Sequence, residues 1–575
     1  MLKKVFGPFF QGINRYGWAL IGLGTIAWSA TMVKSGLVYS FGMGFWGPNG
    51  HDGVWHISLA QGLAHGSLKM LIFSGEKIKN YHIGYDLILA ALHKLTLLPI
   101  HTLYFQILPP ILAILAGSLC YLFILRWTRS TKSAFWATFF VYFGGNWGWV
   151  ISYLRNHDLA GESMFWSQQS ISTLLNPPFA LSLFLIFLGL RFLLSGIENE
   201  NKKSLVISTL LFGILVQIKV YAGVLCLGAL FISGIWRMLQ KKGTSAIKMF
   251  TGVISVSVLV LAPLTTNTNN ILVFKPFWYL ETMMTFSDRL NWPRFGEAMI
   301  NYQLAGNWIK GIPAYLIALF IFWFGNLGTR VFKEVLFIRH IKNPSKMDFI
   351  TVFIFSVIGG GLVLPLLFIQ NGTAWNTIQF MYYSLMFSGI LAGISLGNFL
   401  EKTKSGVSRF LVGGVVFILT IPTTIGTLRH YLPSRPPAKI SLEELQALKF
   451  LAKEADGVIL TLPFDRIAAD AAAGNPPRPL YLYESTAYVS AFTAKPVFME
   501  DEVNLEITGF DWRGRKEKIL DFISTPSQEK AKAFLKKEGI TYVYWIKEGR
   551  GRIDQKQDVL QSIYENSEVQ ILKTK

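Results

Sequence analysis

Residues 102–132 read TLYFQILPPILAILAGSLCYLFILRWTRSTK, an apolar run that ends at Leu125 and is followed by a basic cluster from Arg126 to Lys132. A run of this length is enough for one α-helix to cross the hydrocarbon core of a bilayer. Lysine and arginine gather in the cytoplasmic loops that flank such helices. The stretch therefore predicts a membrane-spanning helix whose C-terminal end faces the cytoplasm.

The same pattern recurs along the chain and predicts about eleven spans. The apolar runs cover residues 17–39, 102–125, 133–152, 179–195, 203–219, 221–237, 249–266, 311–326, 348–369, 377–400 and 409–428. Basic clusters separate them at Arg126–Lys132, Lys202–Lys203, Arg237–Lys248, Arg330–Lys346 and Lys402–Arg409. With the N-terminus inside, all of these clusters fall on the cytoplasmic side, as basic residues do in multi-pass proteins of the cell membrane.

Composition agrees with a membrane protein. The mean hydropathy is +0.39, and only 15% of residues are charged, whereas soluble proteins carry about 25%. We interpret the net charge of +20 as a topology signal and expect no nucleic-acid partner. The two cysteines, Cys120 and Cys226, lie inside apolar runs, which argues against a disulfide framework or a cysteine metal site.

One apolar segment does not fit the pattern of spans. Gly84–Leu98 is short, and its polar and apolar residues separate onto two faces at helical spacing. Such a segment is typical of an amphipathic helix that lies in the membrane interface. We place it in a long first outside loop at about residues 40–101.

An odd number of spans puts the C-terminal region outside the cytoplasm. We therefore predict a transmembrane domain at 1–430 and an extracytoplasmic α/β domain at 431–575, joined by the Pro433–Pro437 stretch. Ser441 and Glu444 form a capping box for a helix that runs to about Ala455. Further helices are expected at 514–524, 528–538 and 557–565, and strands at 457–462, 494–499, 540–546 and 569–572.

Asp52 is the first candidate for chemistry. It lies in the cluster His51-Asp52-Gly53-Val54-Trp55-His56 just after the first span. A carboxylate near apolar surface can accept a proton from an attacking hydroxyl. The alternative is that Asp52 caps the helix that begins near Gly53, because aspartate is favoured at that position.

A divalent metal is a second possibility. Asp52 and His56 are four residues apart and would share one helix face, so both could be ligands. His157, Asp158 or Glu162 of the second outside loop would complete such a site. The alternative is that these histidines only form hydrogen bonds.

Three cationic residues on the outside are candidates to bind a phosphate. Lys219 lies where two apolar runs meet, and an intramembrane lysine is a functional candidate; the alternative is a lysine that anchors a helix end. Arg289 and Arg294 could hold phosphate oxygens through their guanidinium groups, or they could be interfacial arginines among aromatic residues.

The overall arrangement resembles a known family. An inside N-terminus, one span, and a long outside loop with an acid near its start are similar to the GT-C superfamily of membrane glycosyltransferases, of the protein O-mannosyltransferase and aminoarabinose transferase type. The segment Tyr81–Leu92, YHIGYDLILAAL, resembles their Tyr-Pro-Pro-x-Tyr-x-Leu-Leu-Leu-Ala-Leu-Leu helix, with His82-Ile83 in place of Pro-Pro.

The resemblance implies a reaction and a set of site residues. A sugar would pass from a polyprenyl-phosphate carrier to an acceptor glycan, lipid or protein at the outer face of the membrane, among membrane lipids. Asp52 would be the base, and Asp158, or else Glu162, would position the acceptor or a metal. The expected substrate-binding residues are His56, Glu162, Lys219, Arg289 and Arg294.

Two other classes of function stay open. A transporter or flippase of a lipid-linked or small polar substrate would also have many spans, but it would favour polar or broken helices at the midplane. A non-catalytic receptor or assembly protein would not explain the acid in the first loop. We also expect the C-terminal domain to help bind the acceptor through Tyr481, Tyr483, Glu484 and Tyr488, unless these tyrosines only pack the core.

Overall fold

The computed structural model describes residues 11–266, 272–548, 553 and 558–575. The chain divides into two compact units. Unit 1 combines the residues up to Ala30 with Pro110–Pro263 and Thr268–His430, and unit 2 combines Thr31–Pro109, Leu264–Asn267 and Tyr431–Lys575. The expected first outside loop thus belongs to the same unit as the C-terminal segment.

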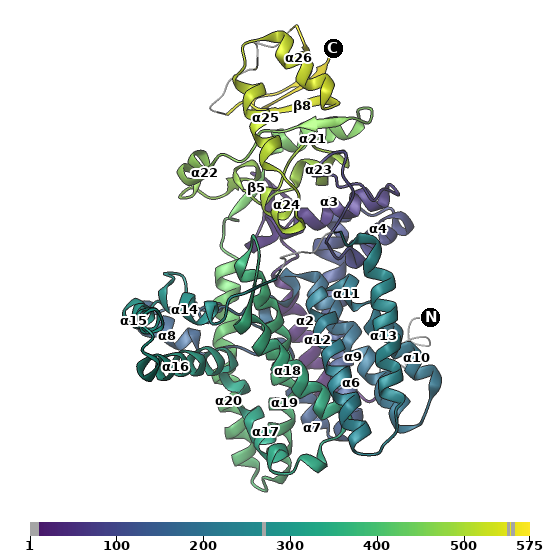
Figure 1. The fold of residues 1–575 in the computed structure, drawn as a ribbon, viewed down its shortest axis with the longest axis vertical. Helices are drawn as coiled ribbons and strands as arrows, with labels where there is room; N and C mark the ends of the chain where they lie inside the picture. Colours follow the sequence, from purple (N-terminus) through teal and green to yellow (C-terminus); the bar gives the residue numbers. More distant parts are fainter. Residues whose placement is uncertain (1–10, 267–271, 549–552, 554–557) are drawn as a thin grey trace. The chain divides into compact units, whose positions relative to one another are not determined.

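Unit 1 is a bundle of long helices (Figure 1), and the eleven predicted apolar runs coincide at least in part with them. The run 17–39 is helical only to Ala30 and ends in a strand at Val38–Tyr39. The helices are α2 (Arg15–Ala30), α6 (Leu108–Thr128), α7 (Thr131–Phe143), α9 (Pro177–Glu198), α10 (Lys202–Gly213), α11 (Leu215–Ile218), α12 (Val220–Leu239), α13 (Ser245–Leu261), α16 (Trp308–Leu327), α18 (Phe349–Leu367), α19 (Gln379–Lys402) and α20 (Gly406–Tyr431).

Eight helical stretches in the described part of the chain are long and apolar enough to cross a membrane. They are Ile100–Thr128, Pro177–Glu198, Val220–Leu239, Ser245–Leu264, Trp308–Lys342, Phe349–Leu367, Ala374–Lys402 and Gly406–Tyr431. This confirms the prediction of a multi-pass membrane protein. The count of eleven stays a prediction, because α2, α7 and the α10–α11 pair are shorter, and so does the orientation of the termini.

Glycines allow the close packing of α7 against α19. A Cβ at Gly393 would lie 2.2 Å from the backbone nitrogen of Ala137, and one at Gly397 would lie 2.6 Å from the Cα of Ser133. Such small residues let two helix backbones approach, which drives association where lipid offers no hydrophobic force between helices.

A second group of helices projects to the side of the bundle (Figure 1). It consists of α8 (Gly148–Asn156), α14 (Trp278–Thr285), α15 (Pro293–Leu304) and α16. Tyr279, Met283, Met299 and Phe322 are fully buried in the apolar cluster that holds the group together. The 3-10 helix η5 (Gly328–Phe332) and helix α17 (Lys333–Lys342) follow α16.

The predicted amphipathic helix in the first loop is present as α4 (Gly84–Thr96) of unit 2. Its polar Asp86 is buried, whereas Leu87, Leu95 and the adjacent Leu97 are exposed, Leu95 to 81%. In a soluble protein an amphipathic helix buries its apolar face and exposes its charged residues. Helix α4 has the opposite arrangement, which fits a helix that lies against lipid.

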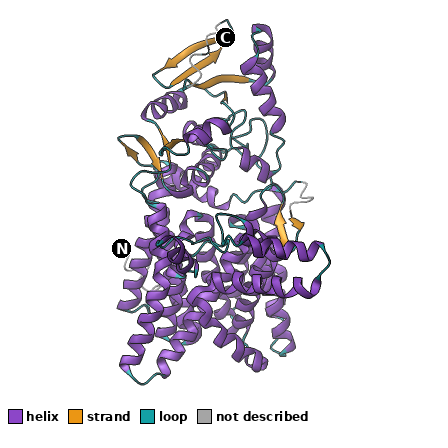
Figure 2. Ribbon diagram, turned by 90° about the vertical axis from the view of Figure 1, so that its left-hand side faces the viewer, coloured by secondary structure: helices purple, strands orange, loops and turns teal. Residues whose placement is uncertain are grey.

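Two sheets organise unit 2. The first has the order β1-β2-β5-β7 and joins β1 (Val38–Tyr39) and β2 (Gly42–Phe45) of the first loop to β5 (Ala438–Ile440) and β7 (Arg478–Pro479), with Met43 opposite Ile440. The second has the order β6-β8-β10-β9, from β6 (Val458–Leu460), β8 (Ile540–Ile546), β10 (Val569–Thr574) and β9 (Leu560–Glu565). Figure 2 shows strands in unit 2 and one short pair in unit 1, β3 (Leu272–Phe274) with β4 (Phe368–Gln370).

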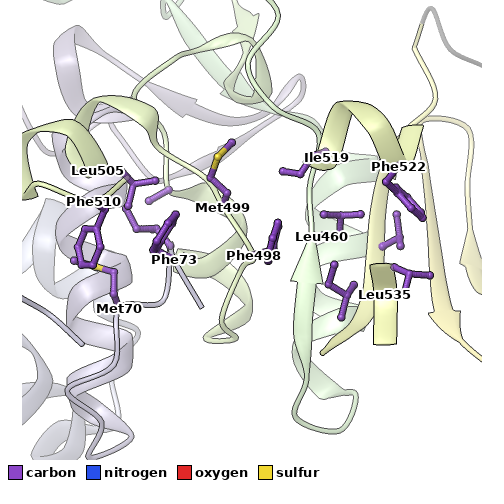
Figure 3. Packing of buried hydrophobic residues seen from close by; sticks show 14 of the residues in the cluster. Met70, Phe73, Leu460, Phe498, Met499, Leu505, Phe510, Ile519, Phe522 and Leu535 are labelled. Atoms are coloured by element: carbon purple, nitrogen blue, oxygen red, sulfur yellow. The ribbon is translucent and has the colours of Figure 1, made fainter. Parts of the chain in front are cut away.

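Unit 2 also contains helices, and several of them contribute side chains to one apolar core. The helices are α3 (Asp52–Ala64), α4, α5 (Ile100–Thr102), α21 (Leu442–Lys453), α22 (Arg466–Ala472), α23 (Tyr488–Thr493), α24 (Glu502–Thr508), α25 (Arg513–Ser524) and α26 (Gln528–Lys537). Met70 and Phe73 of the first loop lie beside Leu505 and Phe510 of the C-terminal segment (Figure 3). Both segments are therefore needed to build this core.

The local predictions for the C-terminal segment are mostly confirmed. The capping box of Ser441 and Glu444 is present at the start of α21, and β6, β8, β10, α25 and α26 lie where they were expected. The expected strand at 494–499 contributes only an isolated bridge of Val497 to Ile459.

The helix expected at 557–565 is wrong, because 560–565 form strand β9. Asn566 turns the chain back into β10, since its side-chain oxygen accepts the backbone N–H groups of Glu568 and Val569. Residues 554–557 lie outside the described residues.

Candidate active site

Arg330 is the most unusual side chain of unit 1. It lies in η5, which begins at Gly328 with φ +54, and a Cβ at Gly328 would lie 2.2 Å from the carbonyl oxygen of Gly145. Glycine is needed there for both the backbone conformation and the close approach. The approach brings Arg330, which is only 1% exposed, against the Gly144-Gly145 stretch that follows α7.

The Arg330 guanidinium is held by neutral oxygens. Its Nε donates to the carbonyl of Leu327 at 3.1 Å, and its Nη2 donates to the carbonyls of Asn326 at 2.7 Å and Gly145 at 3.2 Å and to the Gln169 side chain. No described carboxylate forms an ion pair with it, and its Nη1 makes no hydrogen bond to a described residue. A buried cation without a carboxylate partner is costly, which marks Arg330 as a candidate binding group for an anion.

Arg330 lines a small pocket of unit 1. The other lining residues come from the 3-10 helix η3 (Ser170–Leu175), the start of α9 and the start of α19: Gln168, Gln169, Ser170, Ser172, Thr173, Asn176, Phe179, Tyr382, Leu385 and Met386. Their polar groups are amides and hydroxyls. The pocket therefore offers hydrogen bonds and one positive charge, and none of its lining residues is acidic.

Glu162 lies behind this pocket. Its Oε1 accepts the backbone N–H of Gln169 at 2.8 Å, and Gln169 in turn accepts from Arg330. Burial raises the pKa of Glu162 to about 7, although the hydrogen bond from the Gln169 backbone N–H opposes the shift. Glu162 thus supports the pocket through Gln169.

Lys219 approaches the same pocket. It is 5% exposed and interrupts the helix between α11 and α12, with an extended backbone at φ −158. Its Nζ donates to Asn176 Oδ1 at 3.2 Å, and Asn176 lines the pocket. The positive end of the α12 dipole lies at this residue, which adds to the attraction for an anion.

The two predicted arginines differ. Arg289 stacks on Trp166 with its guanidinium carbon 4.1 Å from the ring centroid, and it pairs with Asp288 at 2.7 Å. Burial lowers the pKa of Arg289, against the opposing charges of Asp288 and of Tyr382, which lines the pocket. Arg294 is exposed on α15, and no described contact connects it to the pocket.

Asp158 follows helix α8 and is exposed. Its carboxylate accepts from the Ser152 hydroxyl and from the backbone N–H of Ala160 at 3.1 Å. These two bonds fix the carboxylate at the turn after α8.

Asp52 belongs to unit 2, as the first residue of α3. The alternative of a helix cap is wrong: the N-cap residue is His51, and no side chain caps the helix. Asp52 is exposed, and its carboxylate makes no hydrogen bond within the described residues. An acid that is fixed at a helix start yet unbonded is available to a ligand.

His56, unlike Asp52, is not available to a ligand. It is buried, and its Nδ1 lies 2.8 Å from Asp86 Oδ1 of α4. Burial raises the pKa of Asp86, and the neighbouring His56 opposes the shift. The pair joins α3 to α4, so the structure gives His56 a role in positioning α3.

The residues expected to hold a metal do not form a site in the described part of the chain. No group of three histidine, cysteine, aspartate or glutamate side chains there could hold a metal ion. Asp52 is exposed, His56 is bonded to Asp86, and Asp158 is held by Ser152.

The fold resembles solved structures of membrane enzymes. The archaeal oligosaccharyltransferase AglB from Archaeoglobus fulgidus, in complex with an inhibitory peptide and a dolichol-phosphate, aligns with a TM-score of 0.50 over 93% of this chain and 70% of that chain, at 11% identity. Its apo form aligns with a TM-score of 0.51 over the same shares, also at 11% identity. The arabinofuranosyltransferase AftD from Mycobacteria aligns with a TM-score of 0.52 over 97% of this chain and 40% of that chain, at 12% identity.

This chain has the GT-C fold. No protein-family model matches its sequence, and a comparison with curated proteins finds no match either. The identities of 11–12% show the GT-C architecture alone.

Within this GT-C fold, Lys219 is connected through Asn176 to the pocket that Arg330 lines. Arg330 was not predicted as a site residue. Arg330 had been assigned to the basic cluster Arg330–Lys346, because four further lysines and arginines follow it within sixteen residues. The signal that could have found it is its place next to the apolar run 311–326, since an arginine inside a span is a functional candidate. That Asp52 shares a cavity with Asp158 stays a prediction.

Proposed function

We propose that this chain is a membrane glycosyltransferase that moves a sugar from a polyprenyl-phosphate carrier to an acceptor at the outer face of the membrane, with Asp52 as the general base. The GT-C fold supports the class of enzyme. AglB, one of the proteins with this fold, was solved with dolichol-phosphate, which supports a lipid phosphate as the carrier.

The observation that carries the proposal is the Arg330 pocket. Nη2 and Nε of Arg330 are occupied by protein oxygens, and Nη1 is left for a ligand in a pocket that has no acidic lining residue. Lys219 is held beside it through Asn176. Buried guanidinium and ammonium groups of this kind bind phosphate through charge-assisted hydrogen bonds.

The proposed chemistry gives each of these groups one role. An acceptor hydroxyl attacks the anomeric carbon of the sugar, and its proton passes to the Asp52 carboxylate. The bond between the anomeric carbon and the phosphate oxygen breaks, and its electron pair stays on the phosphate. Arg330 and Lys219 stabilise the negative charge that the phosphate gains, which lowers the barrier for the step.

Asp158 is proposed to position the acceptor. Its fixed, exposed carboxylate can accept a hydrogen bond from an acceptor hydroxyl.

The test is Asp52→Asn in the purified, full-length protein. Loss of a general base should slow transfer from a defined polyprenyl-phosphate sugar by about 10²–10⁴-fold, with unchanged binding of the carrier. The matched control is Asp511→Asn, which also removes one exposed carboxylate of unit 2.

Two results would count against the proposal. Equal rates of transfer by both variants would show that Asp52 is not the general base. Movement of a lipid-linked sugar across proteoliposome membranes, with no transfer to any acceptor, would favour the transporter instead.

A further inference from the structure

Unit 2 contains its own small pocket, which is lined by residues of the C-terminal segment. Aromatic side chains of Phe464, Tyr481, Tyr483 and Tyr488 form part of its walls. Three of them belong to the segment that the sequence offered for acceptor binding. The structure gathers Tyr481, Tyr483, Glu484 and Tyr488 around one cavity.

The charge of this pocket has one sign. Glu484, Glu500, Asp501 and Glu502 line it, and no lysine, arginine or histidine is among the described lining residues. Only Glu502 forms an ion pair there, with Lys516 at 2.9 Å. The other three carboxylates have no basic partner within the described residues.

Two of those carboxylates, the buried Asp501 and the partly buried Glu500, accept hydrogen bonds from Asn504 and Ser490. Burial raises the pKa of Glu500 well above its usual value and that of Asp501 to about 7. The charges of Asp52 and Glu484 also raise the pKa of Asp501. A bound cation would relieve this repulsion, whereas a phosphate or a carboxylate in the ligand would increase it.

One polar group in the pocket also lacks a partner. The Thr486 hydroxyl is buried, in a residue that is 6% exposed, and it makes no hydrogen bond to any described residue. A buried hydroxyl without a partner costs about 1–3 kcal/mol, and a ligand in the pocket could supply the missing bond.

The pocket is connected to the proposed base. Ser485, next to Glu484, is hydrogen-bonded to His51. The His51 ring also packs edge-on against Tyr483, with the ring centroids 4.7 Å apart. His51 precedes Asp52 directly, so a ligand that contacts Tyr483 or Glu484 lies close to the start of α3.

We propose that this pocket binds a sugar residue of the acceptor that carries a free amine. This proposal rests on the proposed function, because only a transferase has an acceptor. Binding of the amino sugar itself does not require transfer. The aromatic walls suit the apolar face of a sugar ring and an ammonium group. The Thr486 hydroxyl hydrogen-bonds a ring substituent, and Glu484, Glu500 and Asp501 balance the charge of the ammonium.

The experiment is a binding titration of the purified full chain in nanodiscs of zwitterionic lipid at pH 7. The probes are methyl glucosaminide, methyl N-acetylglucosaminide and methyl glucuronide. A charge-assisted contact should make the free amine bind about 10-fold or more tightly than the N-acetyl form, and the glucuronide should bind most weakly. Equal or tighter binding of either of the other two probes would overturn the proposal.

Variants separate the charge from the hydroxyl. Glu484→Gln changes an exposed group and should weaken the amine probe by about 2–5-fold without affecting the N-acetyl probe. Thr486→Val should weaken both. The control is Glu517→Gln, an exposed acid of α25 outside the pocket. If Glu517→Gln weakens the amine probe as much as Glu484→Gln, the binding is not in this pocket.

The outcome is distinguishable from that of the proposed function. Selective binding of the amine with no transfer from any polyprenyl-phosphate sugar would support this binding site and refute the proposed glycosyltransferase activity. Transfer that depends on Asp52 but shows no preference for an amine in the acceptor would support the proposed activity and refute the amine-binding site.

Discussion

Replacing Arg330 by lysine tests the phosphate pocket most directly. The guanidinium has five N–H donors and an ammonium has three. Arg330 already satisfies four protein oxygens, those of Leu327, Gly145, Asn326 and Gln169. A lysine would keep the charge, but it would leave at least one of these oxygens and the pocket without a donor.

Two magnitudes follow from this count. One buried acceptor without a partner costs about 1–3 kcal/mol of stability, so the melting temperature should fall. The lost donor to the leaving phosphate should lower kcat/KM for the lipid-linked donor by about 10²–10³-fold. The loss of activity should thus exceed what a partly unfolded sample would show.

The assay compares initial rates of sugar transfer with thermal melting in the same detergent. The matched control is Arg339→Lys, which makes the same change at an exposed position of α17. If Arg330→Lys melts at a lower temperature but keeps the kcat/KM of Arg339→Lys, then Arg330 only supports the fold and the pocket does not hold the phosphate.

Two further predictions concern the stability of unit 2 and the orientation of the chain in the membrane. Burial raises the pKa of Asp501 to about 7, above the roughly 3.9 of an unfolded aspartate. The folded unit therefore binds more protons between these values, and its stability should fall as pH rises from about 4 to about 7. Asp501→Asn should remove the uptake of about one proton on folding, so the plot of melting temperature against pH should become flatter. An unchanged slope would contradict this prediction. The second prediction is topological: a membrane-impermeant maleimide added to intact spheroplasts should label Asp470→Cys but not Lys242→Cys, with little background because both native cysteines are buried. The opposite labelling pattern would invert the orientation.

Patterns that depend on neighbours along the chain were predictable from the sequence. The apolar runs give helices because a span must satisfy all its backbone groups internally, and the helical period of Gly84–Leu98 predicted α4. The capping box at Ser441 is a local pair of hydrogen bonds, and it is present. The strand β9 was missed because its pairing with β10 is tertiary and overrides the local preference.

The candidate site was less predictable, because its residues meet only in three dimensions. Nothing near His56 in the sequence shows that Asp86 would bind it. The burial of Arg330 depends on the approach of Gly328 to Gly145, which are far apart in the chain. Lys219 was found because it interrupts an apolar run, and that is a local signal.

The pairing of β2 with β5 has a consequence for how the protein is made. Met43 leaves the ribosome long before Ile440 does, at synthesis rates of roughly 5–20 residues per second. During that interval the helix that carries Asp52 has no partner sheet, and residues such as Met70 and Phe73 have not yet met Leu505 and Phe510. Unit 2 therefore matures only after the bundle has been synthesised, so a nascent chain cannot present the proposed base in its final setting.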